Sequence, residues 1–213
     1  MDRPTLYIAN KNYSSWSFRP WMALTGAGVD FEEVLIPFDY PGGNPEIKAI
    51  SPTGRVPLLQ HGVLKIWESL AIIEYVAELY PDAGLLPRDR AERALARSVS
   101  MEMLSSFRPL RSACPMNIRR PKGRIALPDG VDADISRTIW RDLLQQSGGP
   151  FLFGAFSGAD AMFAPVVNRF DIYDLVSRND TLAYMETMKA HPAWRKWEEA
   201  ARAEPWIVPE DEV

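Results

Sequence analysis

Three serines stand close together in the segment NYSSWSFRP. Proline is tolerated in the first turn of a helix, where N–H groups lack helical partners, so Pro20 predicts a helix that starts near Trp16 or Ser17. Ser14 and Ser15 then lie at the positive end of the helix dipole, where hydroxyls and free N–H groups stabilise an anion. Serine is also a favoured N-cap, so ordinary helix capping is the alternative.

Two further features could hold a ligand. Pro57 opens the run PLLQ, which otherwise has the pattern of an interior strand, yet proline has no N–H for the sheet. A cis bond after Val56 would turn the backbone outward and leave the Val56 N–H and C=O for an extended peptide; an edge strand with a trans proline is the alternative. At the next helix start, Ser69 can cap the helix or hold a carboxylate, and Glu68 can accept from an ammonium group.

Alternating strand and helix patterns must position these features. The patterns predict strands at 5–9, 31–36, 56–60 and 63–67, helices at 18–25, 46–50 and 69–80, a turn at 41–45, and a hairpin connection at His61-Gly62. The segment PDAGLLP, residues 81–87, suits a linker. Beyond it, helical patterns occur at 88–111, 132–146, 160–176, 181–190 and 192–203. We expect residues 1–80 to form an α+β domain and residues 88–213 an all-α domain.

The composition narrows the function. With 24 basic and 28 acidic side chains, a net charge of −4 disfavours binding to nucleic acid or to an anionic membrane. No apolar run is long enough to span a bilayer, and no signal-peptide core is present. Cys114 alone allows no internal disulfide or cysteine metal cluster, and the two histidines lie far apart. We expect a cytoplasmic protein without a metal, using hydroxyls, carboxylates or a borrowed thiol.

Taken in order, the serine segment, SPTGRVPLL, WESLAIIEYV and the helical region resemble the glutathione S-transferase family over nearly the whole chain. Ser157 and Asp160 match its capping-box helix start, which serves stability and not catalysis. The resemblance implies a thioredoxin-like domain (βαβ–ββα) followed by an all-α domain, with glutathione as co-substrate and a homodimer active in detoxification. The segment YSSWSFR is most similar to the zeta-type S-S-C-S-x-R signature and to related bacterial serine transferases.

The same resemblance assigns the serine chemistry. It implies that Ser14 donates a hydrogen bond to the glutathione sulfur and stabilises the thiolate, with Ser15 or Ser17 as alternatives. A free thiol with a pKa of ~8.5 is mostly protonated at neutral pH, and the thiolate is the nucleophile. Trp16 replaces the cysteine of the zeta signature, which argues against maleylacetoacetate isomerase activity and thiol–disulfide chemistry.

The rest of the glutathione site is implied by the same resemblance. Val56 pairs with the cysteinyl backbone, Pro57 is cis, and Glu68 and Ser69 hold the γ-glutamyl end. Arg55 meets the glycyl carboxylate; a solvated arginine is the alternative. The implied function is a glutathione transferase acting on a small apolar electrophile. The alternatives are a glutathione-dependent cis–trans isomerase and a binding protein without turnover.

The electrophile pocket is expected between the domains. Met103, Phe107 and Leu110 share one face of the helical pattern 88–111 and would line it, although such a stripe is also typical of plain core. Pro109 should kink this helix. Residues 108–124 hold six basic and no acidic side chains. They either attract an anionic substrate or form a solvated loop.

Overall fold

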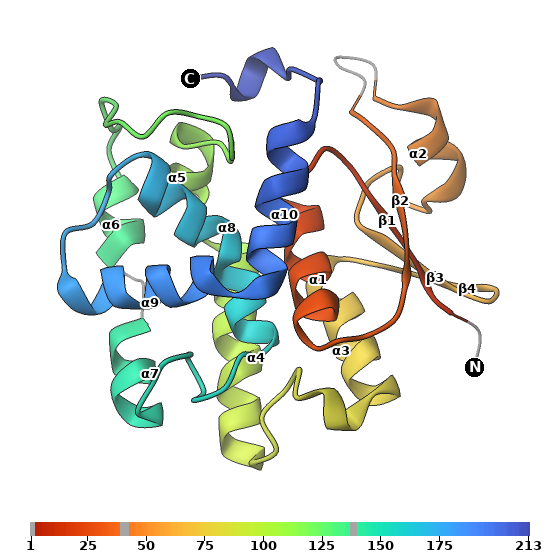
Figure 1. Cartoon of the computed structure of the whole chain (residues 1–213), viewed down its shortest axis with the longest axis horizontal. Coiled ribbons are helices and arrows are strands. Elements are labelled where there is room, and N and C mark those ends of the chain that lie inside the picture. The colour runs from red at the N-terminus through yellow and green to blue at the C-terminus, as the bar shows by residue number, and fades with distance from the viewer. Residues whose placement is uncertain (1–2, 39–42, 137–139) are drawn as a thin grey trace.

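The structure of the chain, a computed structural model, describes residues 3–38, 43–136 and 140–213. Strands and helices alternate up to residue 79, and helices make up most of the remainder (Figure 1). The predicted fold class, a thioredoxin-like domain followed by a helical domain, is confirmed. Among the described residues, no helix is long and apolar enough to cross a membrane.

One sheet forms the base of the first part. In the described residues it has four strands in the order β2-β1-β3-β4, with β1 parallel to β2 and antiparallel to β3. The strands are β1 (Thr5–Ile8), β2 (Glu32–Leu35), β3 (Leu58–His61) and β4 (Leu64–Trp67), and the helices are α1 (Ser15–Gly26), α2 (Pro45–Ile50) and α3 (Ser69–Leu79). His61 pairs with Leu64, so the hairpin turn lies at 62–63, one residue later than predicted.

The helical part begins after a short 3-10 turn, Pro81–Ala83. Its helices are α4 (Arg90–Ser105), α5 (Arg108–Ala113), α6 (Val131–Ser136), α7 (Trp140–Ser147), α8 (Gly158–Ile172), α9 (Asn179–Ala190) and α10 (Pro192–Ala203), and a 3-10 turn at Pro209–Asp211 comes last. The predicted helix 132–146 includes residues 137–139, and the predicted turn 41–45 includes residues 41–42. These residues lie outside the described ranges.

The start of α1 differs from the prediction. The helix begins at Ser15 with Ser14 as its N-cap, so Pro20 lies inside the helix and not in its first turn. A proline there cannot donate to the carbonyl four residues earlier, that of Trp16. The Ser69 hydroxyl, from the first residue of α3, donates to this carbonyl at 2.8 Å. A serine from a neighbouring helix therefore replaces the missing bond.

The predicted helix 88–111 is two helices. We predicted a kink at Pro109, and this was wrong, because α4 ends at Ser105 and Phe107 adopts a left-handed backbone with φ of 59°. Pro109 instead lies in the first turn of α5, a position that proline favours. The Asp134 carboxylate accepts from the N–H of Leu110 at 2.9 Å, which satisfies one N–H of that turn.

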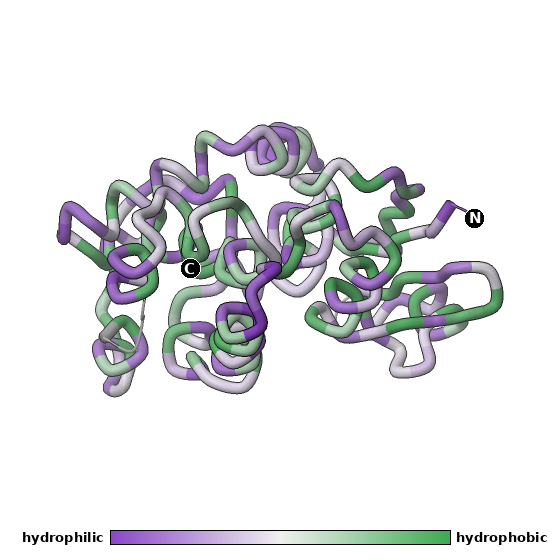
Figure 2. Tube along the Cα trace, turned by 90° about the horizontal axis from the view of Figure 1, so that it is seen from below, coloured by the Kyte–Doolittle hydropathy of each residue, from purple (hydrophilic) through white to green (hydrophobic). Residues whose placement is uncertain are grey.

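Helix α8 joins the two parts of the molecule. It runs through the centre beside α1 and α4 (Figure 1), and almost all its residues are buried. The Arg19 guanidinium of α1 donates to the Met162 carbonyl at 3.0 Å, and Phe18 stacks on Trp197 of α10. Along many helices the trace alternates between hydrophilic and hydrophobic residues, as expected of helices with one buried face (Figure 2). One core therefore continues across the linker.

Candidate active site

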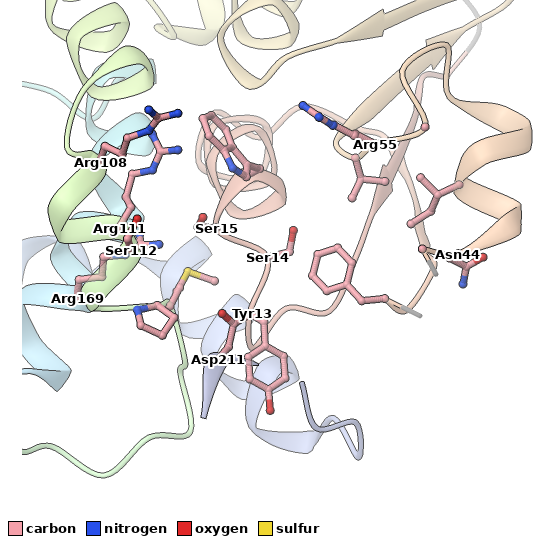
Figure 3. A pocket seen from close by; sticks show the side chains of 18 residues that line it. Tyr13, Ser14, Ser15, Asn44, Arg55, Arg108, Arg111, Ser112, Arg169 and Asp211 are labelled. Atoms are coloured by element: carbon pink, nitrogen blue, oxygen red, sulfur yellow. The ribbon is translucent and has the colours of Figure 1, made fainter. Parts of the chain in front are cut away.

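A pocket of about 540 Å³ opens between the turn before α1 and helix α5 (Figure 3). The N-terminal part contributes residues 13–16, 38, 43–44, 47 and 54–56, and the helical part contributes Arg108, Arg111, Ser112, Pro115, Met116, Arg169 and Asp211. A smaller cavity of about 250 Å³ adjoins it and shares Trp16, Arg55, Val56 and Arg111 with it. Together they offer an elongated ligand a continuous path past the start of α1.

Ser14 and Ser15 both line the larger pocket. The Ser14 hydroxyl donates to the Ser17 Oγ at 2.7 Å, and that oxygen also accepts from the N–H of Ala9 at 3.2 Å. Ser15 is the first residue of α1 and is half-buried. Ser17 is fully buried and does not line the pocket, so it is no longer an alternative for contacting the sulfur. Both remaining hydroxyls stand at the positive end of the helix dipole.

Arginines surround this helix start. Arg19 is buried, and its guanidinium lies 4.3 Å from the centre of the Trp16 ring. Burial, followed by the nearby charges of Arg169 and Arg111, holds the Arg19 pKa well below its ordinary value. Burial likewise lowers the pKa of Arg169 to about 10. The Arg111 guanidinium also lies over the Trp16 ring, at 4.9 Å. Closely spaced, poorly hydrated cations therefore favour an anion at this site.

The predicted backbone feature is present. The Val56–Pro57 bond is cis, Val56 lines both cavities, and Pro57 lines the smaller one. Arg55 lines both cavities as well. Glu68 lines the smaller cavity and has a left-handed backbone with φ of 70°. The structure thus brings these four residues together beside the serines.

Ser69 differs from expectation. It is fully buried, lines neither cavity, and its hydroxyl donates to the Trp16 carbonyl. The predicted role of the Ser69 hydroxyl, to hold a carboxylate, is therefore not supported, because this hydroxyl already serves α1. The sequence did not reveal this structural role of the Ser69 hydroxyl. A helix that starts near Trp16 or Ser17 has Pro20 in its first turn, where no carbonyl lacks a donor because of the proline.

The predicted electrophile wall is wrong. Met103, Phe107 and Leu110 are at most 1% exposed and belong to the hydrophobic core. The break at 106–107 turns α5, so that Arg108 and Arg111 face the pocket instead. The run of six basic residues was the signal for this cationic wall.

Comparison with known proteins places the chain in a family. Residues 13–79 match the family model for the glutathione S-transferase N-terminal domain, and residues 137–200 match the C-terminal domain model. The chain belongs to the glutathione S-transferase family. The resemblance inferred from the sequence, to a zeta-like member of this enzyme family, is confirmed.

Relatives of this transferase extend over most of its length. A probable maleylacetoacetate isomerase of Caenorhabditis elegans is 32% identical over 206 residues, covering 90% of this chain and 94% of the relative. Maleylacetoacetate isomerase of Rattus norvegicus is 30% identical, covering 89% and 93%. A crystal structure of a glutathione transferase homolog from Burkholderia GL BGR1 with bound glutathione has a TM-score of 0.72 at 27% identity, covering 96% of this chain and 100% of that one.

The sequence analysis did not identify several residues that line the pocket of this transferase, among them Tyr13, Arg169 and Asp211. Tyr13 lines the pocket and donates its hydroxyl to Glu212. Arg169 comes from α8, and Asp211 comes from the 3-10 turn after α10. Burial raises the pKa of Asp211 to about 6. Asp211 and the serines are separated by almost 200 residues, so no local pattern could bring them together.

The helix start at Ser157 carries the expected capping box. The Asp160 carboxylate accepts from the N–H and the hydroxyl of Ser157, each at 2.9 Å, and from the Tyr184 hydroxyl at 3.0 Å. It also accepts from the N–H of Leu152. Its role lies in fixing α8. Among the described residues, no cluster of three or more histidine, cysteine or acidic side chains is arranged to hold a metal.

Proposed function

We propose that this transferase binds glutathione across the two adjoining cavities. The sulfur lies at Ser14, the cysteinyl backbone pairs with Val56 beside cis-Pro57, and the γ-glutamyl end lies toward Glu68. The support is that Val56 lines both cavities while Glu68 lines the smaller one, so the ligand spans them in this order. Arg55, which also lines both, supplies a cation for a glutathione carboxylate. The Burkholderia homolog with bound glutathione supports the same ligand.

The observation that carries this proposal is the position of Ser14, a helix N-cap that lines a pocket ringed by arginines. On binding, the hydroxyl of Ser17 turns to donate to Ser14, and Ser14 then donates to the sulfur. The free N–H groups of α1 and the charges of Arg111 and Arg169 add to this stabilisation. Hydrogen bonds to the thiolate and nearby positive charge both lower the thiol pKa.

The second substrate is an anionic electrophile and not a purely apolar one. Four arginines line the larger pocket, Arg55, Arg108, Arg111 and Arg169, against one carboxylate among its described lining residues. Guanidinium groups bind carboxylates strongly and can do so through two parallel hydrogen bonds. Conjugation with a small carboxylated acceptor is the main activity.

Glutathione-dependent isomerisation is the second candidate. The support is the similarity to maleylacetoacetate isomerases together with the arginine-rich wall. This chain differs from the zeta-type signature in one respect, because Trp16 occupies the position of the signature's cysteine. An assay of maleylacetoacetate isomerisation beside conjugation of carboxylated acceptors separates the two activities.

A homodimer is part of the proposal. Large apolar side chains are exposed on β4 and α4, namely Leu64, Trp67, Leu95 and Met101. Light scattering of the purified protein tests the dimer. The lone cysteine, Cys114, is buried and unpaired, which fits a reducing, cytoplasmic location.

The test of the proposed function is a pH titration of bound glutathione, followed by the ultraviolet absorbance of the thiolate. Ser14→Ala should raise the pKa of the bound thiol by about one unit or more, because a donor to the sulfur is lost. Ser15→Ala should shift it less. Ser98→Ala is the matched control, because Ser98 is exposed and donates within α4. An unchanged thiol pKa in Ser14→Ala would remove Ser14 from this role.

A further inference from the structure

The segment 204–213 crosses back over the turn that carries Ser14. The Glu204 carboxylate accepts from the N–H groups of Lys11 and Asn12, at 2.6 and 3.0 Å. Arg119 donates to the Trp206 carbonyl at 2.5 Å and also to the Tyr13 hydroxyl at 2.9 Å. Contacts from both domains therefore fix the path of this segment.

This path brings Asp211 into the pocket. Figure 3 shows its carboxylate on the same side of the pocket as Ser14, beside Tyr13. Its backbone carbonyl accepts from the Asn117 side chain at 3.4 Å. Within the described residues the carboxylate itself has no hydrogen bond and no ion pair closer than 4 Å. A half-buried carboxylate without a protein partner is an open acceptor for a ligand donor.

The charges around Asp211 decide what it can do. Arg169 on α8 attracts it, and Glu210 and Glu212 on its own segment repel it. The other charged groups lining the pocket are Arg55, Arg108 and Arg111. Burial outweighs the attraction of Arg169 and raises the Asp211 pKa to about 6. A carboxyl group in this range can both take up and release a proton near neutral pH.

We infer that Asp211 is a further catalytic residue, which accepts the thiol proton of glutathione and later donates it to the second substrate. The inference rests on the proposed function. In the first step the S–H bond breaks, the proton moves to a carboxylate oxygen of Asp211, and the electron pair stays on sulfur. In the second step the thiolate adds to an α,β-unsaturated carbonyl compound, and the C=C electron pair moves toward its carbonyl oxygen. The resulting enolate takes the proton from Asp211, and Asp211 is again an ionised carboxylate.

The other groups in the pocket are unsuited to this role. Arginine side chains stay protonated, and the Ser14 hydroxyl serves as a hydrogen-bond donor to the sulfur. The Tyr13 hydroxyl donates to Glu212, outside the pocket. Among the described residues that line the pocket, Asp211 is the one carboxyl group.

The test compares Asp211→Asn with Glu210→Gln, using glutathione and acetylacrylate, an α,β-unsaturated ketone that carries a carboxylate. Both variants remove one negative charge from the same turn, but Glu210 is exposed and does not line the pocket. At equilibrium Asp211→Asn should retain the thiolate absorbance of bound glutathione, because the thiol proton can then pass to solvent. Its kcat should fall by about 100-fold or more, because the enolate loses its proton donor. Glu210→Gln should stay within about twofold of the wild type.

The pH profile provides the second readout. In the wild type, kcat should fall as the pH rises through about 6, because Asp211 loses its proton, and this fall should be absent in Asp211→Asn. Asp211→Glu should recover part of the rate, because the longer carboxylate still carries the proton. A wild-type kcat and pH profile in Asp211→Asn would overturn the inference, as would a loss of glutathione binding. The proposed function fails separately, through an unchanged thiol pKa in Ser14→Ala.

Discussion

Removing the Ser69 hydroxyl should expose how α1 tolerates a proline in its interior. Pro20 cannot donate to the carbonyl of Trp16, and Ser69 donates to it instead at 2.8 Å. Ser69→Ala therefore leaves this partly buried carbonyl without its donor. Leaving a buried acceptor unsatisfied costs about 1–3 kcal/mol of the free energy of unfolding. In a chain of this size that corresponds to a fall in melting temperature of about 2–12 °C.

The assay is urea unfolding without glutathione, in a double-mutant cycle with Pro20→Ala. An alanine at position 20 supplies an N–H to the same carbonyl, so Ser69→Ala should cost about 0.5 kcal/mol or less in that background. Ser98→Ala is the control, because its hydroxyl makes a similar bond at an exposed position, and should stay within about 0.5 kcal/mol. An equal cost of Ser69→Ala in both backgrounds would refute the reasoning.

The packing and the charges support three other predictions. In Gly158→Ala the new Cβ would lie 2.7 Å from a side-chain carbon of α3, so the free energy of unfolding, measured by thermal unfolding, should fall by about 1–3 kcal/mol. Gly123→Ala is the control and should change it little, because a Cβ there would meet open space. Arg108→Gln should raise the KM for a carboxylated acceptor about tenfold more than the KM for a neutral one. Arg88→Gln is the control and should change neither KM, because Arg88 lies outside the larger pocket. Equal changes in KM for the two acceptors in Arg108→Gln would argue against an anionic substrate. The pKa of Asp211 is raised in the folded protein, so its contribution to the free energy of unfolding is complete below its unfolded pKa of ~3.9 and is lost as the pH rises through about 6. In Asp211→Asn, the free energy of unfolding measured in urea should therefore change less with pH between these two values.

The sequence predicted the fold well because its local signals agree with the tertiary structure. The strand runs and the capping box at Ser157 each depend on neighbouring residues, and they appear where expected. The boundaries that failed depended on distant contacts. Pro20 lies inside α1 because Ser69 replaces its lost bond, and the break at Phe107 reflects a backbone conformation that the helical pattern does not reveal.

The candidate site was predicted only in part, because one of its walls consists of local motifs and the other depends on distant contacts. Ser14, Val56 and Glu68 belong to short motifs, and the structure places them around adjoining cavities. The opposite wall comes from helices whose packing is not encoded locally. The apolar stripe that contains Met103 therefore indicated a pocket and proved to be core, while Asp211 gave no local signal at all.

The packing of α1 against α8 and α10 limits how the N-terminal part of this enzyme can be separated from its helical part. The centre of the Phe18 ring lies 5.2 Å from that of Trp194 and 4.7 Å from that of Trp197, and the Trp197 indole N–H donates to the Lys11 carbonyl at 3.0 Å. A fragment ending at the linker would leave the outer side of its first helix as a bare aromatic surface prone to self-association. Chimeras that exchange helical domains between relatives should remain monodisperse only when the incoming domain carries a matching pair of indoles.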